Sequence, residues 1–374
     1  MKIKFKSWIQ NLPEYIAGRT IEEIKKTYNL PVVYKLASNE NIFGPCDQVI
    51  EFLKNNIDDI NYYPDSECRE IKQAIALKFG VTQQNVIIGN GTDQIIEMIC
   101  DCFISQGDNI VIADPNFLIY EKATLKCGGT AIKVPLMDFR QDIAGIVNAV
   151  DGKTKIVFIA NPHNPSGTNI AEKEFKYLIE GVSRDILIVA DEAYYEYLSP
   201  PDRIDTVGYL VENDNIISLR TFSKAYGLAG LRIGYGIANR EIISGLEKIR
   251  LPFNVSSVAQ KAAVKALDND WYVEKIRDII LSEKEKFYSI FEKEGISYIK
   301  SYSNFILIKT DSFGAEIVEE LLKSGFIVRP GENMGVKGFI RVTIATPDIN
   351  DKFLDSFIKI YKETLYKKIT IVKI

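Results

Sequence analysis

The segment from Ser218 to Gly236 sets a lysine among residues that could bind a phosphate group. Thr221 and Ser223 carry hydroxyls just before Lys224, and Arg232 follows it in a glycine-rich stretch. Hydroxyls and a guanidinium bind phosphate through charge-assisted hydrogen bonds, which would leave a nearby lysine free to act as a nucleophile. A surface turn could have the same composition, so the segment needs support from the rest of the chain.

Support comes from short apolar runs that each end in a polar cluster. Apolar runs of strand length alternate with helical patterns from residue 85 onward, which indicates a largely parallel sheet buried on both faces. Ligands of such sheets bind at the carboxyl ends of the strands, so we expect the clusters to meet at one edge. The clusters are Gly89–Asp93, Asn161–Gly167, Asp191–Tyr194 and Thr221–Lys224.

Together these clusters supply the groups that pyridoxal phosphate needs. Lys224 would provide the amine for the Schiff base, and Asp191 the anion for the pyridine nitrogen. Asn164 and Tyr194 could donate to the phenolate oxygen, and Phe117 could stack on the ring. The phosphate cup would combine a helix start with the residues around the lysine: Gly91, Thr92, Asp93, Thr221, Ser223 and Arg232. Taken singly, these residues also fit a helix cap, a turn or a core ring.

The composition indicates a small ligand. Lys and Arg total 46 against 50 Asp and Glu, a formal charge of −4. The chain therefore lacks the excess of basic residues that is typical of proteins that bind nucleic acid or an anionic membrane. No stretch approaches ~18 uninterrupted apolar residues, so we expect no membrane span. The one histidine, His163, argues against a multi-histidine metal site. Five scattered cysteines predict a reduced, cytoplasmic protein.

The length predicts more than one hydrophobic core, because 374 residues exceed the size at which a single core usually stops growing. We expect an N-terminal arm over 1–45 that is part of the small domain. A large cofactor-binding α/β domain should span 46–260 and a small α+β domain 261–374. A long charged helix over about 271–293 is predicted to link the two domains.

Two arginines in strand-like runs of the small domain are candidate ligands for an anion. Arg329 and Arg341 are each embedded in apolar surroundings. The ordinary interpretation of such an arginine is that its guanidinium lies in solvent while its aliphatic part packs against apolar side chains. Bidentate binding of a substrate carboxylate or phosphate is the functional alternative.

As a set, the motifs resemble fold-type I pyridoxal-phosphate enzymes, and within them the histidinol-phosphate aminotransferase family. The likeness extends over nearly the whole chain and implies a mostly parallel central sheet in the large domain, a small α+β domain and an obligate homodimer. The residues that carry it are Leu36–Asn41, Tyr63–Asp65, Gly89–Asp93, Asn164–Gly167, Asp191–Tyr194, Thr221–Tyr235, Ile327–Pro330, Ile340–Val342 and Thr346–Pro347.

The resemblance also implies roles for residues that the motifs alone leave open. Tyr63 matches a tyrosine that reaches the cofactor phosphate of the neighbouring subunit. Arg341 matches the arginine that binds a carboxylate or phosphate of the substrate, Arg329 and Tyr15 match positions near the substrate phosphate, and Asn39 falls on the substrate side. The implied reaction belongs to amino-acid biosynthesis: glutamate donates an amino group that a phosphorylated keto compound, imidazole acetol phosphate, accepts.

Four positions depart from the family pattern. Ile42 stands where proline is usual, Asn116 where threonine is, His163 where asparagine is and Ala345 where glycine is. Because one cofactor site serves several reactions, two alternatives stay open: transamination of another phosphorylated ketone, such as dihydroxyacetone phosphate to serinol phosphate, and decarboxylation of a phosphorylated amino acid. A fold kept only for binding would be expected to lack the lysine or the aspartate. Hydrolase and dehydrogenase chemistry rank lower still.

Overall fold

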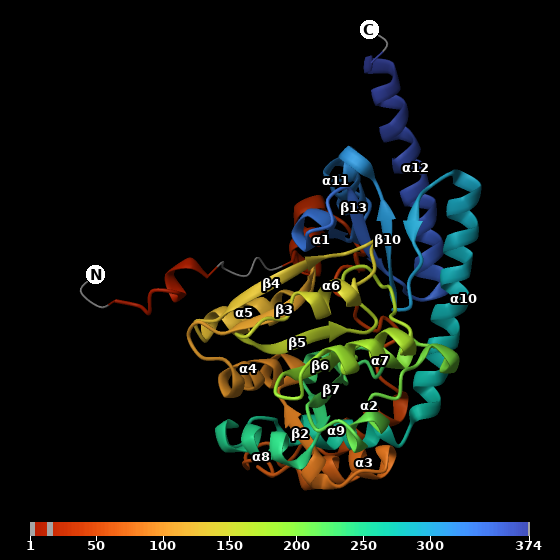
Figure 1. Cartoon of the computed structure of the whole chain (residues 1–374). Coiled ribbons are helices and arrows are strands. Elements are labelled where there is room, and N and C mark those ends of the chain that lie inside the picture. Colours follow the sequence, from red (N-terminus) through yellow and green to blue (C-terminus); the bar gives the residue numbers. More distant parts are fainter. Residues whose placement is uncertain (1–3, 13–17, 373–374) are drawn as a thin grey trace.

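The computed structural model, which describes residues 4–12 and 18–372, places a seven-stranded sheet at the centre of the large domain (Figure 1). The order is β2-β8-β7-β6-β5-β3-β4; β8 runs antiparallel to both neighbours and the other neighbouring pairs are parallel. The expectation of a mostly parallel sheet is therefore confirmed. The strands are β2 (Val86–Gly89), β3 (Asn109–Asp114), β4 (Thr130–Pro135), β5 (Thr154–Ala160), β6 (Leu187–Asp191), β7 (Ile216–Thr221) and β8 (Gly234–Ala238).

Alternating side chains of these strands enter different core clusters, as the two-residue period of a strand requires. In β3, Ile110 and Ile112 pack with α4, α5 and α8, whereas Val111 and Ala113 pack with α6 and α7. Both faces are therefore apolar, which is why the strands read as continuous apolar runs. The helices are α1 (Ile21–Tyr28), α2 (Asp47–Asn55), α3 (Arg69–Phe79), α4 (Gly91–Phe103), α5 (Leu118–Lys126), α6 (Ile143–Asn148), α7 (Glu172–Gly181), α8 (Arg240–Ile249), α9 (Ser257–Leu267), α10 (Asp270–Glu294), α11 (Gly314–Lys323) and α12 (Pro347–Val372).

The small domain is built on a four-stranded antiparallel sheet in the order β12-β13-β10-β9. The segment near the N-terminus joins it, because β1 (Tyr34–Lys35) pairs in parallel with β11 (Phe326–Ile327). The domain bounds at residues 45 and 260 stay a prediction. The remaining strands are β9 (Tyr298–Ile299), β10 (Phe305–Lys309), β12 (Arg329–Pro330) and β13 (Phe339–Thr343).

Helix α10 connects the two domains along one side of the molecule (Figure 1). It carries Val273 and Ile276 near its start and Phe287 and Phe291 near its end into one continuous core cluster. That cluster includes strand residues of both sheets, so the small domain is held over the large one by shared apolar packing. Within the described ranges, no helix combines the length and apolarity needed to cross a bilayer.

Candidate active site

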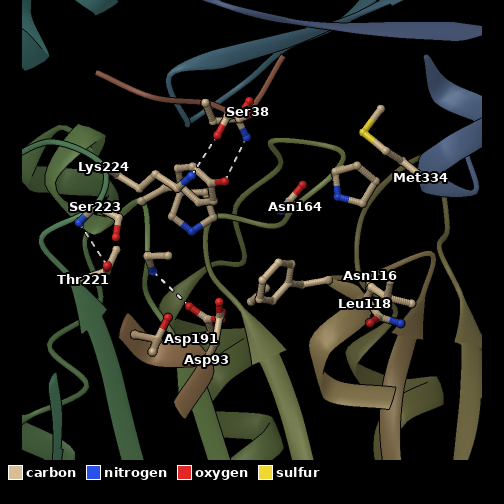
Figure 2. A pocket seen from close by; sticks show the side chains of 18 of the residues that line it. Ser38, Asp93, Asn116, Leu118, Asn164, Asp191, Thr221, Ser223, Lys224 and Met334 are labelled. Carbon is tan, nitrogen blue, oxygen red and sulfur yellow. Dashed lines mark hydrogen bonds between the residues drawn. The ribbon is translucent and has the colours of Figure 1, made fainter. Parts of the chain in front are cut away.

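A cavity of about 280 Å³ lies at the carboxyl edge of the large sheet, where the small domain covers it (Figure 2). Its walls come from the ends of β5, β6 and β7, from the starts of α4 and α5, and from β12 and β13. The polar clusters therefore meet at one edge of the sheet, as the sequence predicts. Predicted site residues that line the cavity are Asn39, Thr92, Asp93, Phe117, Asn164, Asp191, Tyr194, Thr221, Ser223, Lys224, Arg232, Arg329 and Arg341.

One end of the cavity has the features of a phosphate cradle. Helix α4 begins at Gly91 without a side-chain cap, so its first N–H groups are free to bind an anion. Arg232 lies across this helix start: a Cβ on Gly91 would meet its Nη2 at 2.6 Å, and Gly91 has a φ of +71°. Arg232 also contacts Asp93 at 3.2 Å and the Ser223 hydroxyl at 3.4 Å. Only glycine suits position 91, on both conformational and steric grounds.

Asp191 ends β6 and supplies a buried carboxylate at the floor of the cavity. It is 5% exposed, and burial raises its pKa from 3.8 to about 6. The Tyr120 hydroxyl donates to Oδ2 at 2.6 Å and the Ala193 N–H donates to Oδ1 at 3.1 Å, and both bonds oppose that rise. A cationic ring nitrogen in the cavity would be a suitable partner for this carboxylate. The sequence does not predict the contact of Tyr120 with Asp191. The available signal is that Tyr120 lies about one helical turn after Phe117, a predicted site residue at the start of α5.

Behind Asp191, a buried ion pair anchors the end of β6. Glu192 accepts from Arg220 at 3.0 Å and from the Thr206 hydroxyl at 2.7 Å, and the two charged side chains are 1% and 2% exposed. The pair lies between β6 and β7 and joins the segments that carry Asp191 and Lys224. Its charges balance each other away from water, so the loss of one would leave the other uncompensated.

Glu192→Gln is therefore expected to destabilise the protein by about 3–5 kcal/mol, because Arg220 would lose the carboxylate with which it forms its buried ion pair. Urea unfolding of the cofactor-free protein, followed by circular dichroism, measures this. Replacing both partners with apolar residues of similar size should recover much of the loss. An unchanged urea midpoint in the single variant would contradict a structural role for the pair.

Lys224 projects into the cavity from the turn after β7 and reaches the segment that precedes α2. Its Nζ donates to the backbone carbonyl of Ser38 at 3.0 Å and lies 5.6 Å from the ring centroid of Tyr194 (Figure 2). Within the described chain, no carboxylate lies within ion-pair distance of this amine. The amine is thus placed at the cavity without a structural counter-ion, as a nucleophile requires.

Two arginines enter the same cavity from the small domain. Arg329 on β12 and Arg341 on β13 are direct cross-strand neighbours. Arg341 donates to Asn164 Oδ1 at 2.6 Å and to the Ala37 carbonyl at 2.9 Å, and burial lowers its pKa to about 10. Among residues 4–12 and 18–372, neither arginine forms an ion pair. Two guanidiniums without carboxylate partners in this part of the chain could bind an anionic ligand.

One predicted site residue of the described chain, Tyr63, lies away from the cavity. Tyr63 is 82% exposed and stacks on Phe253 at 4.6 Å between ring centroids, outside the cavity of its own chain. Tyr15 falls outside the described residues.

Of the four departures from the family pattern, Asn116 lines the cavity. His163 is fully buried with its Nδ1 2.8 Å from the Ser166 hydroxyl, and burial lowers its pKa to about 4.

The uncapped α4 start, the glycine beneath Arg232 and the buried carboxylate of Asp191 together fit pyridoxal phosphate. An amine, a carboxylate and a phosphate cradle at the carboxyl edge of this α/β sheet define a fold-type I pyridoxal-phosphate enzyme. The model of the family "Aminotransferase class I and II" matches residues 31–357. The chain belongs to this family of transaminases, and pyridoxal phosphate is its cofactor.

Individual relatives extend over nearly the whole chain. A histidinol-phosphate aminotransferase of Moorella thermoacetica is 42% identical, covering 94% of this chain and 91% of its own. One of Caldicellulosiruptor saccharolyticus is 40% identical, covering 96% and 100%. The crystal structure of a histidinol-phosphate aminotransferase from Sinorhizobium meliloti in complex with pyridoxal-5'-phosphate is 27% identical, with a TM-score of 0.88 over 96% of this chain and 98% of that one. The resemblance inferred from the motifs is confirmed.

Proposed function

We propose that the chain transfers an amino group between glutamate and a small phosphorylated keto compound, with histidinol phosphate and imidazole acetol phosphate as the substrate pair. The observation that carries the proposal is the wall formed by Arg329 and Arg341, two cations that line the cavity and have no carboxylate partner within residues 4–12 and 18–372. The names of the relatives support the choice of substrate. A phosphate and a carboxylate are the anions that a guanidinium binds best.

Bound pyridoxal phosphate supplies an electron-withdrawing ring that stabilises negative charge on the substrate carbon. Lys224 would hold the cofactor through its amine, and the same amine would move the proton at the substrate Cα. Asp191 would keep the ring nitrogen protonated by remaining ionised. Asn164 presents its amide N–H groups to the cavity, because its side-chain oxygen accepts from Arg341. Tyr194 would donate to the same cofactor oxygen as Asn164. The helix start at Gly91–Asp93 would hold the phosphate together with Thr221, Ser223 and Arg232.

The substrate is tested by two half-reactions. Glutamate alone should bleach the visible absorption of the loaded enzyme, and histidinol phosphate should do the same in its own half-reaction. Dihydroxyacetone phosphate is the comparison acceptor after the glutamate step, and phosphoserine tests decarboxylation. Release of carbon dioxide from phosphoserine, without bleaching by glutamate, would contradict a transaminase of this specificity.

Arg329→Gln should raise the KM for the phosphorylated substrate by roughly 10- to 100-fold, the equivalent of one lost charge-assisted hydrogen bond of about 1.5–3 kcal/mol. The KM for glutamate should change much less, because glutamate carries no phosphate. Arg329→Lys retains the charge and serves as the matched control. Steady-state kinetics with each substrate varied in turn measure the split, and equal effects on both KM values would place Arg329 elsewhere in the reaction.

We also propose that the chain forms a homodimer in which Tyr63 reaches the neighbouring cofactor phosphate. Support comes from two adjoining exposed apolar segments that the Tyr63–Phe253 stack brings together. Exposed apolar surface of this kind usually marks an interface. Sedimentation should give twice the chain mass of 42.3 kDa. Leu251→Glu should shift the mass toward that of one chain, whereas a monomeric wild type would rule the dimer out. The exposed residues are Ile57, Ile60, Tyr62, Tyr63, Leu251 and Phe253.

The cytoplasm remains the proposed location. All five cysteines carry free thiols, and disulfides form mainly in oxidising compartments. A cell fractionation experiment that follows the transaminase activity tests this.

A further inference from the structure

We propose that Asn39 is a positioning residue that directs the hydroxyl proton of Tyr194 into the cofactor cavity. Thr343 on β13 would fix the carboxamide of Asn39 in the orientation that this requires. The proposal rests on the cofactor placement given above and not on the identity of the substrate. The substrate-binding role that the resemblance implies for Asn39 stays a prediction.

The side-chain oxygen of Asn39 lies beside the hydroxyl of Thr343. The backbone N–H of Asn39 donates to Thr343 Oγ1 at 3.1 Å, and the same Oγ1 lies 3.4 Å from Asn39 Oδ1. Thr343 is fully buried, so its single hydroxyl proton needs a protein acceptor. In the part of the chain that the structure describes, Asn39 Oδ1 is the side-chain acceptor within reach. The oxygen of the carboxamide therefore faces Thr343, and the nitrogen faces away.

The hydroxyl of Tyr194 lies at the nitrogen end of the Asn39 carboxamide. Asn39 Nδ2 lies 2.9 Å from this hydroxyl oxygen, and an amide nitrogen can only donate. Tyr194 therefore accepts from Asn39, and its own proton must find another acceptor. No described residue accepts it, and Tyr194 lines the cavity beside Lys224 and Asn164. The proton is left for a ligand oxygen in the cavity, which the phenolate oxygen of the cofactor provides.

The small domain holds Asn39 in place through Thr343 and Asn304. Asn39 has a φ of +58°, in the left-handed region, and its backbone carbonyl accepts from Asn304 Nδ2 at 3.1 Å. Asn304 directly precedes β10, and Thr343 ends the neighbouring β13. Asn39 is 1% exposed, so bulk water has little access to these bonds. One residue before β10 and one at the end of β13 thereby fix the position of Asn39, and with it the direction in which the Tyr194 hydroxyl donates.

This arrangement has a spectroscopic consequence. A hydrogen bond donated to an ionised oxygen favours its ionised form. If Tyr194 donates to the phenolate oxygen, the visible absorption band of the cofactor-loaded enzyme should titrate with a lower pH midpoint than it would without this hydrogen bond. Tyr194→Phe should raise that midpoint by about one to two pH units, the equivalent of one charge-assisted hydrogen bond.

Asn39→Asp gives the sharpest test of the proposal. A carboxylate at this position can only accept, so it should draw the Tyr194 proton away from the cavity. Aspartate also tolerates the left-handed backbone, so the loop should keep its shape. A pH titration of the visible band should therefore show a midpoint as high as that of Tyr194→Phe. The double variant should show no further rise, because both changes remove the same bond.

Thr343 offers a matched pair of controls. Thr343→Val keeps the shape but lets the carboxamide of Asn39 turn over, so the midpoint should rise. Thr343→Ser keeps the hydroxyl and should retain the wild-type midpoint. If Asn39→Asp folds poorly, as judged by loss of bound cofactor, Asn39→Gly suits the same backbone and should also raise the midpoint, by less.

Two outcomes would overturn the proposal in different ways. Wild-type midpoints in Asn39→Asp and Thr343→Val, alongside a raised midpoint in Tyr194→Phe, would show that Asn39 does not direct the proton. A wild-type midpoint in Tyr194→Phe itself would show that the phenolate oxygen lies elsewhere, and the cofactor placement would fall with the proposal. Neither outcome depends on the substrate, so a wrong substrate assignment would be recognised separately.

Discussion

Replacing Lys224 with alanine is expected to lower the turnover number by roughly 10⁴-fold or more, because one side chain is proposed to hold the cofactor and to move the proton. The fold should survive the change. Lys224 Nζ contacts the Ser38 carbonyl, which borders the cavity and can bind water in its place. Single-turnover kinetics with glutamate measure the loss, and urea unfolding of the cofactor-free protein should give a wild-type midpoint.

Lys224→Arg is the matched control for this prediction. It keeps a positive charge at the cavity, but a guanidinium stays protonated and cannot act as a nucleophile or base. The loss should therefore equal that of the alanine variant. Borohydride reduction of the loaded wild type, followed by peptide mapping, should place the label on Lys224. A label on another lysine, or activity above about 1% in the alanine variant, would contradict the assignment.

The meeting of Asp191 and Lys224 could be predicted because it follows from a rule of parallel sheets. Each residue comes just after an apolar run, and β6 and β7 are parallel neighbours whose ends lie side by side. The long helix α10 could be predicted for a similar reason. Its charged pattern covers 25 residues, and Gly295 ends it in a left-handed conformation that glycine adopts readily. Both predictions depend on local sequence and on rules that apply to every fold of the class.

Contacts across the two domains could not be predicted in the same way. Asn39 and Thr343 are 304 positions apart, and their bond depends on how the small domain packs on the large one. Hydrophobic periodicity shows which face of an element is buried but not which polar side chain it will meet. The hydrogen bond from Tyr120 to Asp191 is a similar case. The sequence shows Tyr120 only as one residue of an apolar helix face, which does not predict a polar partner for its hydroxyl. The sequence therefore predicts the groups at the cavity better than their orientations.

Asp191→Asn is expected to lower the turnover number by about 10³-fold, because a neutral amide cannot keep the ring nitrogen protonated. Cofactor affinity should fall as well. Asparagine keeps an oxygen that can accept from the Tyr120 hydroxyl, so the cavity should retain its shape. Tyr120→Phe leaves the carboxylate and should cause a smaller loss. Cofactor titration by absorbance and single-turnover kinetics measure both effects.

The stability of the same variant should change in the opposite direction. The pKa of an ordinary aspartate is 3.8, and that of Asp191 in the folded chain is about 6. Between these two pH values the carboxyl is protonated in the folded state and ionised in the unfolded state. Stability is therefore lost as the pH rises from about 4 to 6, and the buried carboxylate costs the cofactor-free protein about 3 kcal/mol above that range. Asparagine carries no charge at any pH and avoids this cost.

Cofactor-free Asp191→Asn should thus unfold at a higher urea concentration than the wild type near pH 8, and the difference should shrink toward pH 4. Function and stability separate at this position because the buried carboxylate has hydrogen bonds but no ion pair among the described residues. The protonated ring of the cofactor would supply the missing positive charge. A variant that is less stable near pH 8, or that retains wild-type turnover, would show that Asp191 serves the fold and not the cofactor.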